Sequence, residues 1–286
     1  MTMKTILVPL EDSSAAPSML RTAWLAAQRF GGMIEGLHVH RTLPGVVVAD
    51  IGGYAAATPD LMQSFEQEDQ QRARQAHAAF DAFFREHGVT PGDQGDAAQP
   101  GAVWNDDNEP GDQVIGMYAR VFDLTVVGRP VSGQSAPAMS TLETVLFESG
   151  RPILIAPPTS PTSLGETIVI HWNGSTETAR TVALALPFLC QAKRTVVVSV
   201  EGVTVPGPSA EAMARYLKRN GIAAQLRELP NDSGGGGAVV LKEAQSLGAD
   251  LLIKGAYTHS RLRQMIFGGA TSHILAEAQI PVFMAH

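Results

Sequence analysis

The residues best suited to chemistry lie near the carboxyl terminus, in the segment Gly255–Thr271. This segment has a glycine at the end of an apolar stretch, a loop with two arginines, and the pair Gly268-Gly269 directly before a predicted helix. Glycines let backbone N–H groups approach phosphate oxygens closely, and a helix amino terminus adds partial positive charge. The segment therefore predicts an anion site that can hold a triphosphate, with a set of tight turns as the alternative.

His259, Arg261 and Arg263 follow the first glycine of this segment. Arginine forms bidentate hydrogen bonds to phosphate, so these side chains are candidates for phosphate contacts, and a solvated loop is the alternative. A second glycine run, Gly234–Gly237, lacks the lysine and hydroxyl residue of a P-loop and leads into Ala238. We interpret this run as a flexible connection.

His38 and His40 alternate along one predicted strand, so their imidazoles share a face and suit two metal ligands. The sequence shows no third ligand beside them, and we predict an imidazole pair without a metal. Cys190 is the only cysteine, which excludes an internal disulfide and a multi-cysteine metal site. We expect an inert, buried thiol there. No serine, histidine and acid at recognisable spacing suggest a hydrolase.

The composition points to a globular protein that binds neither nucleic acid nor membrane. The chain has 286 residues, of which 44% are hydrophobic, and a formal charge of −7, which argues against broad contact with phosphate backbones. No apolar run approaches the ~18 residues of a membrane-spanning helix. The first apolar stretch meets Glu11 and Asp12 directly, which favours a strand over a secretory signal. A cytoplasmic location is therefore expected.

The chain contains an internal repeat. Three pairs of segments match in the same order: Lys4–Ser14 with Glu166–Thr176, Phe122–Gly128 with Ala249–Gly255, and Arg151–Ala156 with Ile280–Ala285. We interpret the chain as two copies of one unit, residues 1–158 and 163–286, joined near Pro157–Pro161. Because a missed repeat would change the whole fold assignment, this observation organises the rest.

Each copy alternates apolar strands with helical stretches, the pattern of a parallel sheet covered by helices, and we expect five strands per copy. In the first copy Ser13 or Ser14 is expected to cap a helix that runs to Phe30 and ends at Gly31. Its other predicted elements are the strand Ile34–His40, a helix over 59–86, a helix over 111–121, and strands ending at Gly128 and Ala156. The insertion Leu43–Thr58 and the irregular stretch Thr90–Pro110 are expected to be loops over the sheet.

The second copy is more compact. Its predicted strands are Ile168–Trp172, Thr195–Val200, Ala223–Leu229, Leu251–Lys254 and Val282–Ala285, and its predicted helices are Thr176–Leu189, Ser209–Asn220, Ala238–Leu247 and Ser272–Ala278. In an open parallel sheet, ligands bind at the carboxyl ends of strands near the point where the strand order reverses. Function is therefore expected around Glu11 and Gly128 in the first copy and around Asn173 and Gly255 in the second.

These features together resemble the universal stress protein family in its tandem two-domain form. The resemblance rests on the turns Val8–Ser13 and Ile170–Ser175, the strand Ala249–Gly255, the following glycine loop and the terminal strand Pro281–Met284. It covers nearly the whole chain and implies fold class α/β, with two tandem adenine-nucleotide-alpha-hydrolase-like domains, each a five-stranded parallel sheet flanked by helices. It also implies a cytoplasmic location, a role in stress adaptation and, in some members, bound ATP.

ATP-binding members of that family carry a glycine, two residues, a second glycine, nine residues, and a third glycine followed by serine or threonine. Here Gly255 fills the first place, Thr258 replaces the second glycine, Gly268 is the third, and Gly269 stands where the hydroxyl residue would be. Thr271 lies two positions further on and is a candidate to supply the hydroxyl.

The family's acidic residue after the first strand, which contacts the nucleoside, corresponds to Asn173, with Gly174 beside it. The resemblance thus implies a weakened ATP site in the second domain, with or without Mg²⁺, or no bound cofactor if binding has been lost. Its expected residues are Asn173, Gly174, Gly255, Thr258, Arg261, Gly268, Gly269 and Thr271. No catalytic residue is predicted.

The first domain departs further from the motif. Gly128 is kept, and Val131 stands in place of the motif's second glycine. The later positions of the motif fall around Met139–Thr141, where there is no glycine pair. Pro130 removes a backbone amide that a phosphate site would use, although Glu11 preserves the acid. We predict that this domain holds no triphosphate.

Three functions follow from these predictions. The first is an adenine-nucleotide-responsive binding protein that regulates an unidentified protein partner. The second is a nucleotide-independent interaction protein that uses another small ligand or the surface of an intramolecular pseudo-dimer. The third is a slow ATPase, for which no base is evident. In single-domain relatives the terminal strands pair across a dimer, so the resemblance implies that Ile153–Ala156 and Val282–Ala285 pair within one chain, which would bury two sheet edges. A homodimer of whole chains is left open.

Overall fold

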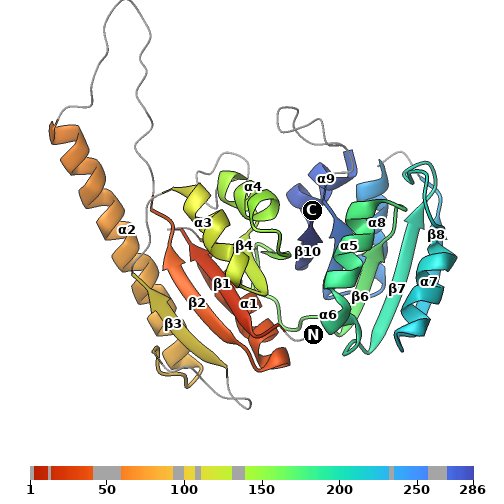
Figure 1. The fold of residues 1–286 in the computed structure, drawn as a ribbon, viewed down its shortest axis with the longest axis horizontal. Coiled ribbons are helices and arrows are strands. Elements are labelled where there is room, and N and C mark those ends of the chain that lie inside the picture. The colour runs from red at the N-terminus through yellow and green to blue at the C-terminus, as the bar shows by residue number, and fades with distance from the viewer. Residues whose placement is uncertain are drawn as a thin grey trace, which may run out of the picture.

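The computed structural model describes residues 3–11, 14–40, 59–92, 100–106, 111–130, 139–231, 235–256 and 269–286. Two α/β units follow one another along the chain and lie side by side (Figure 1). None of the described helices is long and apolar enough to cross a bilayer.

The first unit has five strands, as expected. They are β1 (Thr5–Leu10), β2 (Met33–His38), β3 (Gly101–Asn105), β4 (Leu124–Gly128) and β5 (Ile153–Ala156). Between them lie α1 (Ala16–Phe30), α2 (Pro59–Glu86), α3 (Asp112–Tyr118), the short 3-10 helix η1 (Ala119–Val121) and α4 (Met139–Glu148). Gly31 ends α1 in the left-handed conformation with φ 61°, as the sequence predicted.

The second unit repeats this order. Its strands are β6 (Thr167–His171), β7 (Arg194–Val200), β8 (Ala224–Leu229), β9 (Leu251–Gly255) and β10 (Val282–Ala285). Its helices are α5 (Thr176–Leu184), α6 (Leu186–Leu189), α7 (Ala210–Arg219), α8 (Gly235–Ser246) and α9 (Gly269–Glu277). Ser175 and Ser209 cap α5 and α7, since their side chains accept hydrogen bonds from Thr178 N and Ala212 N.

The two units share one ten-stranded sheet, in the order β3-β2-β1-β4-β5-β10-β9-β6-β7-β8. All strand pairs within a unit are parallel, whereas β5 and β10 pair antiparallel, with Leu154 opposite Phe283. The predicted pairing of these two strands within one chain is confirmed. Each would otherwise present an open edge of backbone groups, so the pairing satisfies both edges at once.

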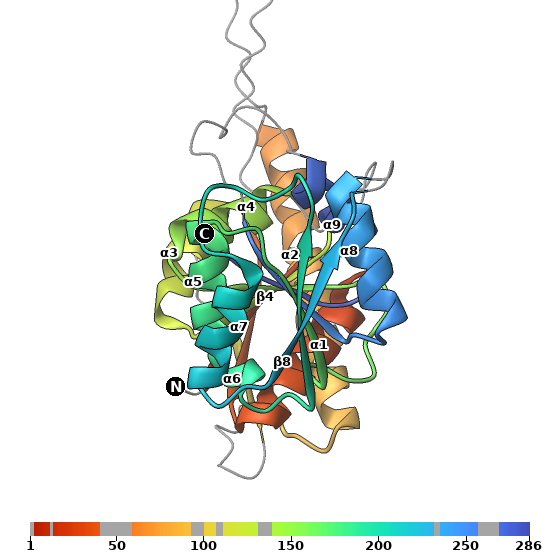
Figure 2. The ribbon, with the colours of Figure 1, turned by 90° about the vertical axis from the view of Figure 1, so that its right-hand side faces the viewer.

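Two helix layers cover the sheet. One face packs against α1, α2, α5, α6 and α7, and the other against α3, α4, α8 and α9. In Figure 2 the edge strand β8 lies between α7 on one side and α8 on the other. Crossovers to opposite faces begin at β1 and β6, so the strand order reverses beside these two strands.

The structure corrects four expectations. The stretch Thr90–Pro110 contains β3, which pairs with β2. The amino-terminal cap of α1 is Ala15, without a side-chain hydrogen bond, so Ser14 does not cap it, and Ser13 lies outside the described residues. Gly235–Gly237 form the first turn of α8 rather than a flexible connection. Cys190, which follows α6, is exposed rather than buried.

The glycines of α8 serve packing. A side chain at position 236 would come within 2.7 Å of Val203 Cγ2, and one at position 237 within 2.8 Å of Ala270 O. Both distances are shorter than a carbon atom tolerates, so α8 approaches its neighbours this closely only with glycine here. Leu43–Thr58 lies outside the described residues.

Two arginines of the first unit bind backbone carbonyls of the second. Arg29 donates to Leu164 O at 3.1 Å, Gly165 O at 2.9 Å and Gln191 O at 2.6 Å. Arg129 follows β4 and donates to Ala276 O and Ala278 O at the carboxyl end of α9. A cation is favourable at that end of a helix, so Arg129 adds an electrostatic link across the β5–β10 seam.

We expect Arg129→Ala to lower the free energy of unfolding by about 1–2 kcal/mol, because charge-assisted hydrogen bonds at a partly exposed site are lost. The matched control is Arg194→Ala, which removes only the exposed contact to Gln225 within the second unit. Urea unfolding of both variants measures the difference. Equal stability of the two variants would contradict a role for Arg129 in joining the units.

Candidate functional site

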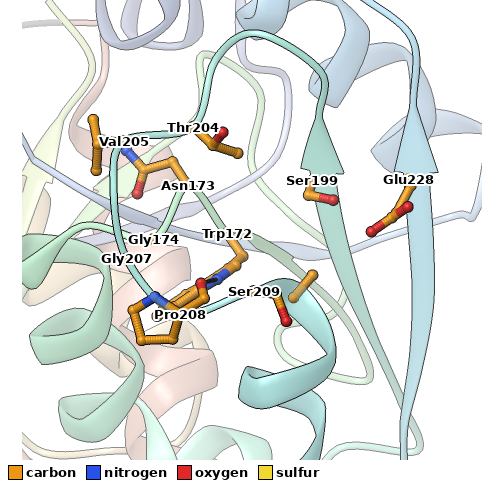
Figure 3. A pocket seen from close by; sticks show the side chains of 11 residues that line it. Trp172, Asn173, Gly174, Ser199, Thr204, Val205, Gly207, Pro208, Ser209 and Glu228 are labelled. Carbon is orange, nitrogen blue, oxygen red and sulfur yellow. Dashed lines mark hydrogen bonds between the residues drawn. The ribbon is translucent and has the colours of Figure 1, made fainter.

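A pocket of about 260 Å³ opens at the carboxyl ends of β6, β7 and β8 (Figure 3). Its walls come from three strand ends and from the loop that leads into α7. The lining residues include Trp172, Asn173, Ser199, Thr204, Ser209 and Glu228. Ser199 and Glu228 project into it from neighbouring strands. The pocket therefore offers hydroxyl and carboxylate groups beside the point where the strand order reverses.

The turn after β6 is a capping structure. Asn173 Oδ1 accepts hydrogen bonds from Ser175 N at 3.2 Å and from Thr178 Oγ1 at 2.7 Å. These bonds fix the start of α5, where free N–H groups need acceptors. Asparagine at the family's acidic position thus already has two partners within the turn.

The loop between β7 and α7 packs against this turn. Val205 N donates to Asn173 O at 2.9 Å, and Trp172 Nε1 donates to Pro208 O at 2.9 Å. A side chain at Gly207 would lie 2.2 Å from Gly174 O, so only glycine allows this approach. The loop forms one wall of the pocket and leaves Ser199 and Glu228 on the other.

Gly255, the first glycine of the predicted phosphate motif, ends β9 next to α5. A side chain there would lie 2.4 Å from Thr178 N and 2.6 Å from Thr178 Oγ1. The glycine is therefore required by helix packing, whatever else it contacts. This explains why a glycine pattern alone does not establish a phosphate site.

Lys254 is buried beside Gly255. Its Nζ donates to Gly255 O at 2.8 Å and to Thr271 Oγ1, in the first turn of α9, at 2.6 Å. Burial lowers the pKa of Lys254 to about 8. Both of these acceptors, within the part of the chain that the structure describes, are neutral, although a buried charge usually has an ionic partner. The structure thus places a cation directly beneath the amino terminus of α9.

His171 lies opposite Lys254 in the register of β6 and β9. Its side chain is fully buried, and neither ring nitrogen has a hydrogen-bond partner among the described residues. Burial, with the nearby Lys254 charge, lowers the pKa of His171 to about 3. The imidazole is therefore neutral at physiological pH.

The eight predicted site residues are only partly described. Asn173 and Gly174 border the pocket, Gly269 begins α9, and Thr271 is buried with its hydroxyl bound to Lys254. Thr258, Arg261 and Gly268 lie outside the described residues, as do His259 and Arg263. Their role in binding stays a prediction.

Sequence reasoning missed Lys254, His171, Ser199 and Glu228. A lysine and a histidine inside the apolar runs of β9 and β6 were the available signal, because buried strands seldom contain such residues. Ser199 and Glu228 gave no signal, since polar residues at strand ends are usually solvated.

The first unit is organised differently at the equivalent edge. Gly128 ends β4, but the side chain of Arg129 donates to Ala278 O at the end of α9, in the interface between the two units. His38 and His40 lie at the end of β2, where Asp69 of α2 joins them. The sequence showed no third partner for this histidine pair because Asp69 lies on a distant helix.

Comparisons with known proteins agree with this architecture. Residues 227–286 match the model of the universal stress protein family. No curated protein sequence matches the chain. A universal stress protein from Archaeoglobus fulgidus has a similar structure, with a TM-score of 0.67 and 14% identity over 99% of this chain and 96% of that one.

Two proteins from Pseudomonas aeruginosa also share the fold. A functionally unknown protein, PA1789, gives a TM-score of 0.55 at 16% identity over 99% of this chain and 92% of that one. A putative universal stress protein gives 0.51 at 17% identity over 99% and 93%. The tandem α/β fold is thus shared with these structures over nearly their whole length. The resemblance is confirmed to this extent: residues 227–286 match the family model, and the chain shares the fold of a universal stress protein over nearly its whole length.

Replacing Lys254 by methionine should stabilise the protein at pH 7 by up to about 3 kcal/mol, because the folded state holds a charged group whose pKa is about 8 instead of 10.5. The unfolded chain binds the extra proton between those pH values, so wild-type stability rises with pH across this window. The advantage of the variant should therefore shrink from pH 8 to pH 10.5. Urea unfolding against pH measures it, and a constant difference would contradict the assignment.

His171→Leu tests the buried imidazole. With a folded pKa of about 3, the wild type resists protonation that the unfolded chain accepts below about 6.5, so its stability falls as the pH drops through that window, by up to about 5 kcal/mol. The variant should lose this part of the acid sensitivity and be at least as stable at pH 7. Parallel stability curves for the two proteins between pH 6.5 and 4 would show that His171 is not involved.

Proposed function

We propose that this protein is an adenine-nucleotide-responsive binding protein of the stress response, with ATP in the second unit. The observation that supports it most is the pocket at the ends of β6, β7 and β8, which adjoins the turn at the family's nucleoside position. Its volume, about 260 Å³, is close to the lower end of the range for small-molecule sites, about 300–1,000 Å³. A nucleoside is a ligand of suitable size, with its phosphates left outside the pocket.

In this proposal Glu228 takes over the part of the missing acid. Asn173 cannot supply a carboxylate, whereas Glu228 projects into the same pocket from β8. A carboxylate accepts hydrogen bonds from ribose hydroxyls or from the adenine amino group. Ser199 offers a further donor and acceptor on the neighbouring strand.

Lys254 would favour a polyphosphate by electrostatic attraction. Its buried ammonium has two neutral acceptors, one of them in the first turn of α9. Backbone N–H groups at a helix amino terminus and a nearby cation both favour an anion. The described residues place no carboxylate against this ammonium, and a phosphate chain that leaves the pocket toward α9 would provide a negative charge there. Binding would then alter association with a protein partner in the cytoplasm.

A nucleotide-independent interaction protein is the second candidate. It is favoured by the hydrogen bonds that already occupy Asn173 Oδ1 and the Thr271 hydroxyl. Both groups would have to exchange partners before they could contact a ligand. This candidate predicts no affinity for ATP.

Titration of purified protein with ATP and Mg²⁺ in a calorimeter tests the proposal. Lys254→Met should weaken ATP binding by about 10- to 100-fold, because a charge-assisted hydrogen bond to phosphate is lost, and leave adenosine binding nearly unchanged. Glu228→Gln should weaken the binding of both ATP and adenosine. Lys218→Met, at the exposed end of α7, is the control and should change neither.

Failure of the wild type to bind ATP at millimolar concentration would favour the second candidate. ATP binding that Lys254→Met and Glu228→Gln both leave intact would place the nucleotide elsewhere. Phosphate release that stops in Glu228→Gln would instead support slow hydrolysis.

A further inference from the structure

A compact group of metal-ligand side chains lies in the first unit, away from the proposed nucleotide site. His40 Nδ1 is 2.5 Å from Asp69 Oδ2, and His38 Nε2 is 3.4 Å from Asp69 Oδ1. One ligand atom from each residue lies within 4.8 Å of the other two. Two imidazole nitrogens and a carboxylate therefore converge on one point.

Two of the three side chains are largely buried on packed elements, and His40 lies two residues beyond the end of β2 with 26% of its side chain exposed. His38 is the last residue of β2, and its side chain is 4% exposed. Asp69 is 14% exposed and belongs to α2, which Phe80 and Phe84 anchor in the core. The ligands thus come from the carboxyl end of the interior strand β2 and from a packed helix, which suits a preformed site.

The position of the group corresponds to the pocket of the second unit. Leu10 pairs with His38 in the sheet, and the ungapped alignment of the two copies matches Leu10 of the first copy to Trp172 of the second. His171 pairs with Val198, so Trp172 lies beside Ser199. His38 therefore occupies the place that Ser199, a residue of the pocket, occupies in the second unit.

The third ligand comes from helix length that only the first unit has. Gly88 and Gly221 follow α2 and α7, and Val89 N and Ile222 N form the same backbone hydrogen bond back into the helix. When the two helices are aligned on these glycines, the first residue of α7 corresponds to His77 of α2. The helix α2 therefore extends further toward the amino terminus, back to Pro59. Asp69 lies on this extension, which has no counterpart in the second unit.

We propose that His38, His40 and Asp69 bind one zinc ion. Zinc takes imidazole and carboxylate ligands at about 2.0–2.2 Å, and three protein ligands with a fourth position for water form a common zinc site. Donor atoms around such an ion are about 3.3 Å apart, so shifts of about 1 Å convert the observed group into a coordination sphere. The first unit would then sense a divalent metal, while the second unit binds nucleotide.

Zinc binding to the full-length apoprotein tests this inference, with a chromophoric chelator as competitor and unfolding temperature as a second readout. The wild type should bind one Zn²⁺ per chain and unfold at higher temperature with zinc. Asp69→Asn and His40→Ala should weaken zinc binding by at least about 100-fold. Removing a residue that only supports a metal ligand already costs up to about 100-fold in metal affinity, and these residues are the ligands themselves. Mg²⁺ should not compete, because it prefers oxygen ligands.

His77→Ala is the matched control. His77 lies on the same helix as Asp69, next to Asp81 of that helix and to Asp106, which follows β3. This variant should keep the zinc affinity of the wild type. Asp69→Asn preserves the shape of the side chain, so a folded variant without zinc binding supports the site. If zinc does not bind at stoichiometric concentration, or binds Asp69→Asn as it binds the wild type, the inference is wrong and Asp69 only links α2 to β2. ATP titration is independent of this result.

Discussion

The antiparallel pairing of β5 with β10 is the interaction on which the rest of the structure depends. It joins two parallel five-stranded sheets into one, because each unit contributes the edge strand that pairs with the other. The helix layers then continue across the seam, so α1 and α5 pack on one face and α4 and α9 on the other. Arg29 and Arg129 add polar links on both sides of this seam.

This arrangement frees each unit to diverge at its own strand ends. Equivalent register positions contain His38 in the first unit and Ser199 in the second, and the helix that follows is 28 residues long in one and 10 in the other. A small hydroxyl residue and a short helix leave a pocket, whereas a histidine and a long helix fill the same place with ligand groups. The two proposed sites are thus two outcomes of one scaffold.

The buried polar groups at β6 and β9 are costly to the fold. Lys254 and His171 lie side by side within an otherwise apolar layer beneath α8 and α9, and burial disfavours a proton on each of them. Apolar residues at these positions would pack without that cost. Such groups are commonly retained where a ligand uses them, which agrees with an anion at the start of α9.

The sequence contained enough information for nine of the ten strands and for the repeat, because these depend on apolar periodicity and on matched segments. The count of five strands per unit and the pairing of β5 with β10 came from comparing the two copies and from the resemblance to the family. The sequence did not reveal β3, since Trp104 and Asn105 break the apolar pattern between irregular flanks. Gly235–Gly237 read as a flexible connection because close helix packing is a tertiary property. Asp69 could not be paired with His40 before the position of α2 was known, and Lys254 could not be paired with Thr271 before the start of α9 was known.

We propose that the two units divide their functions, with the nucleotide bound to the second unit alone. A crystal structure with a non-hydrolysable ATP analogue and Mg²⁺ tests it most directly. We expect adenosine density against Ser199 and Glu228, with phosphates beside Lys254 and the first turn of α9. Analogue density beside Glu11 and Gly128 in the first unit, with the second unit empty, would contradict it.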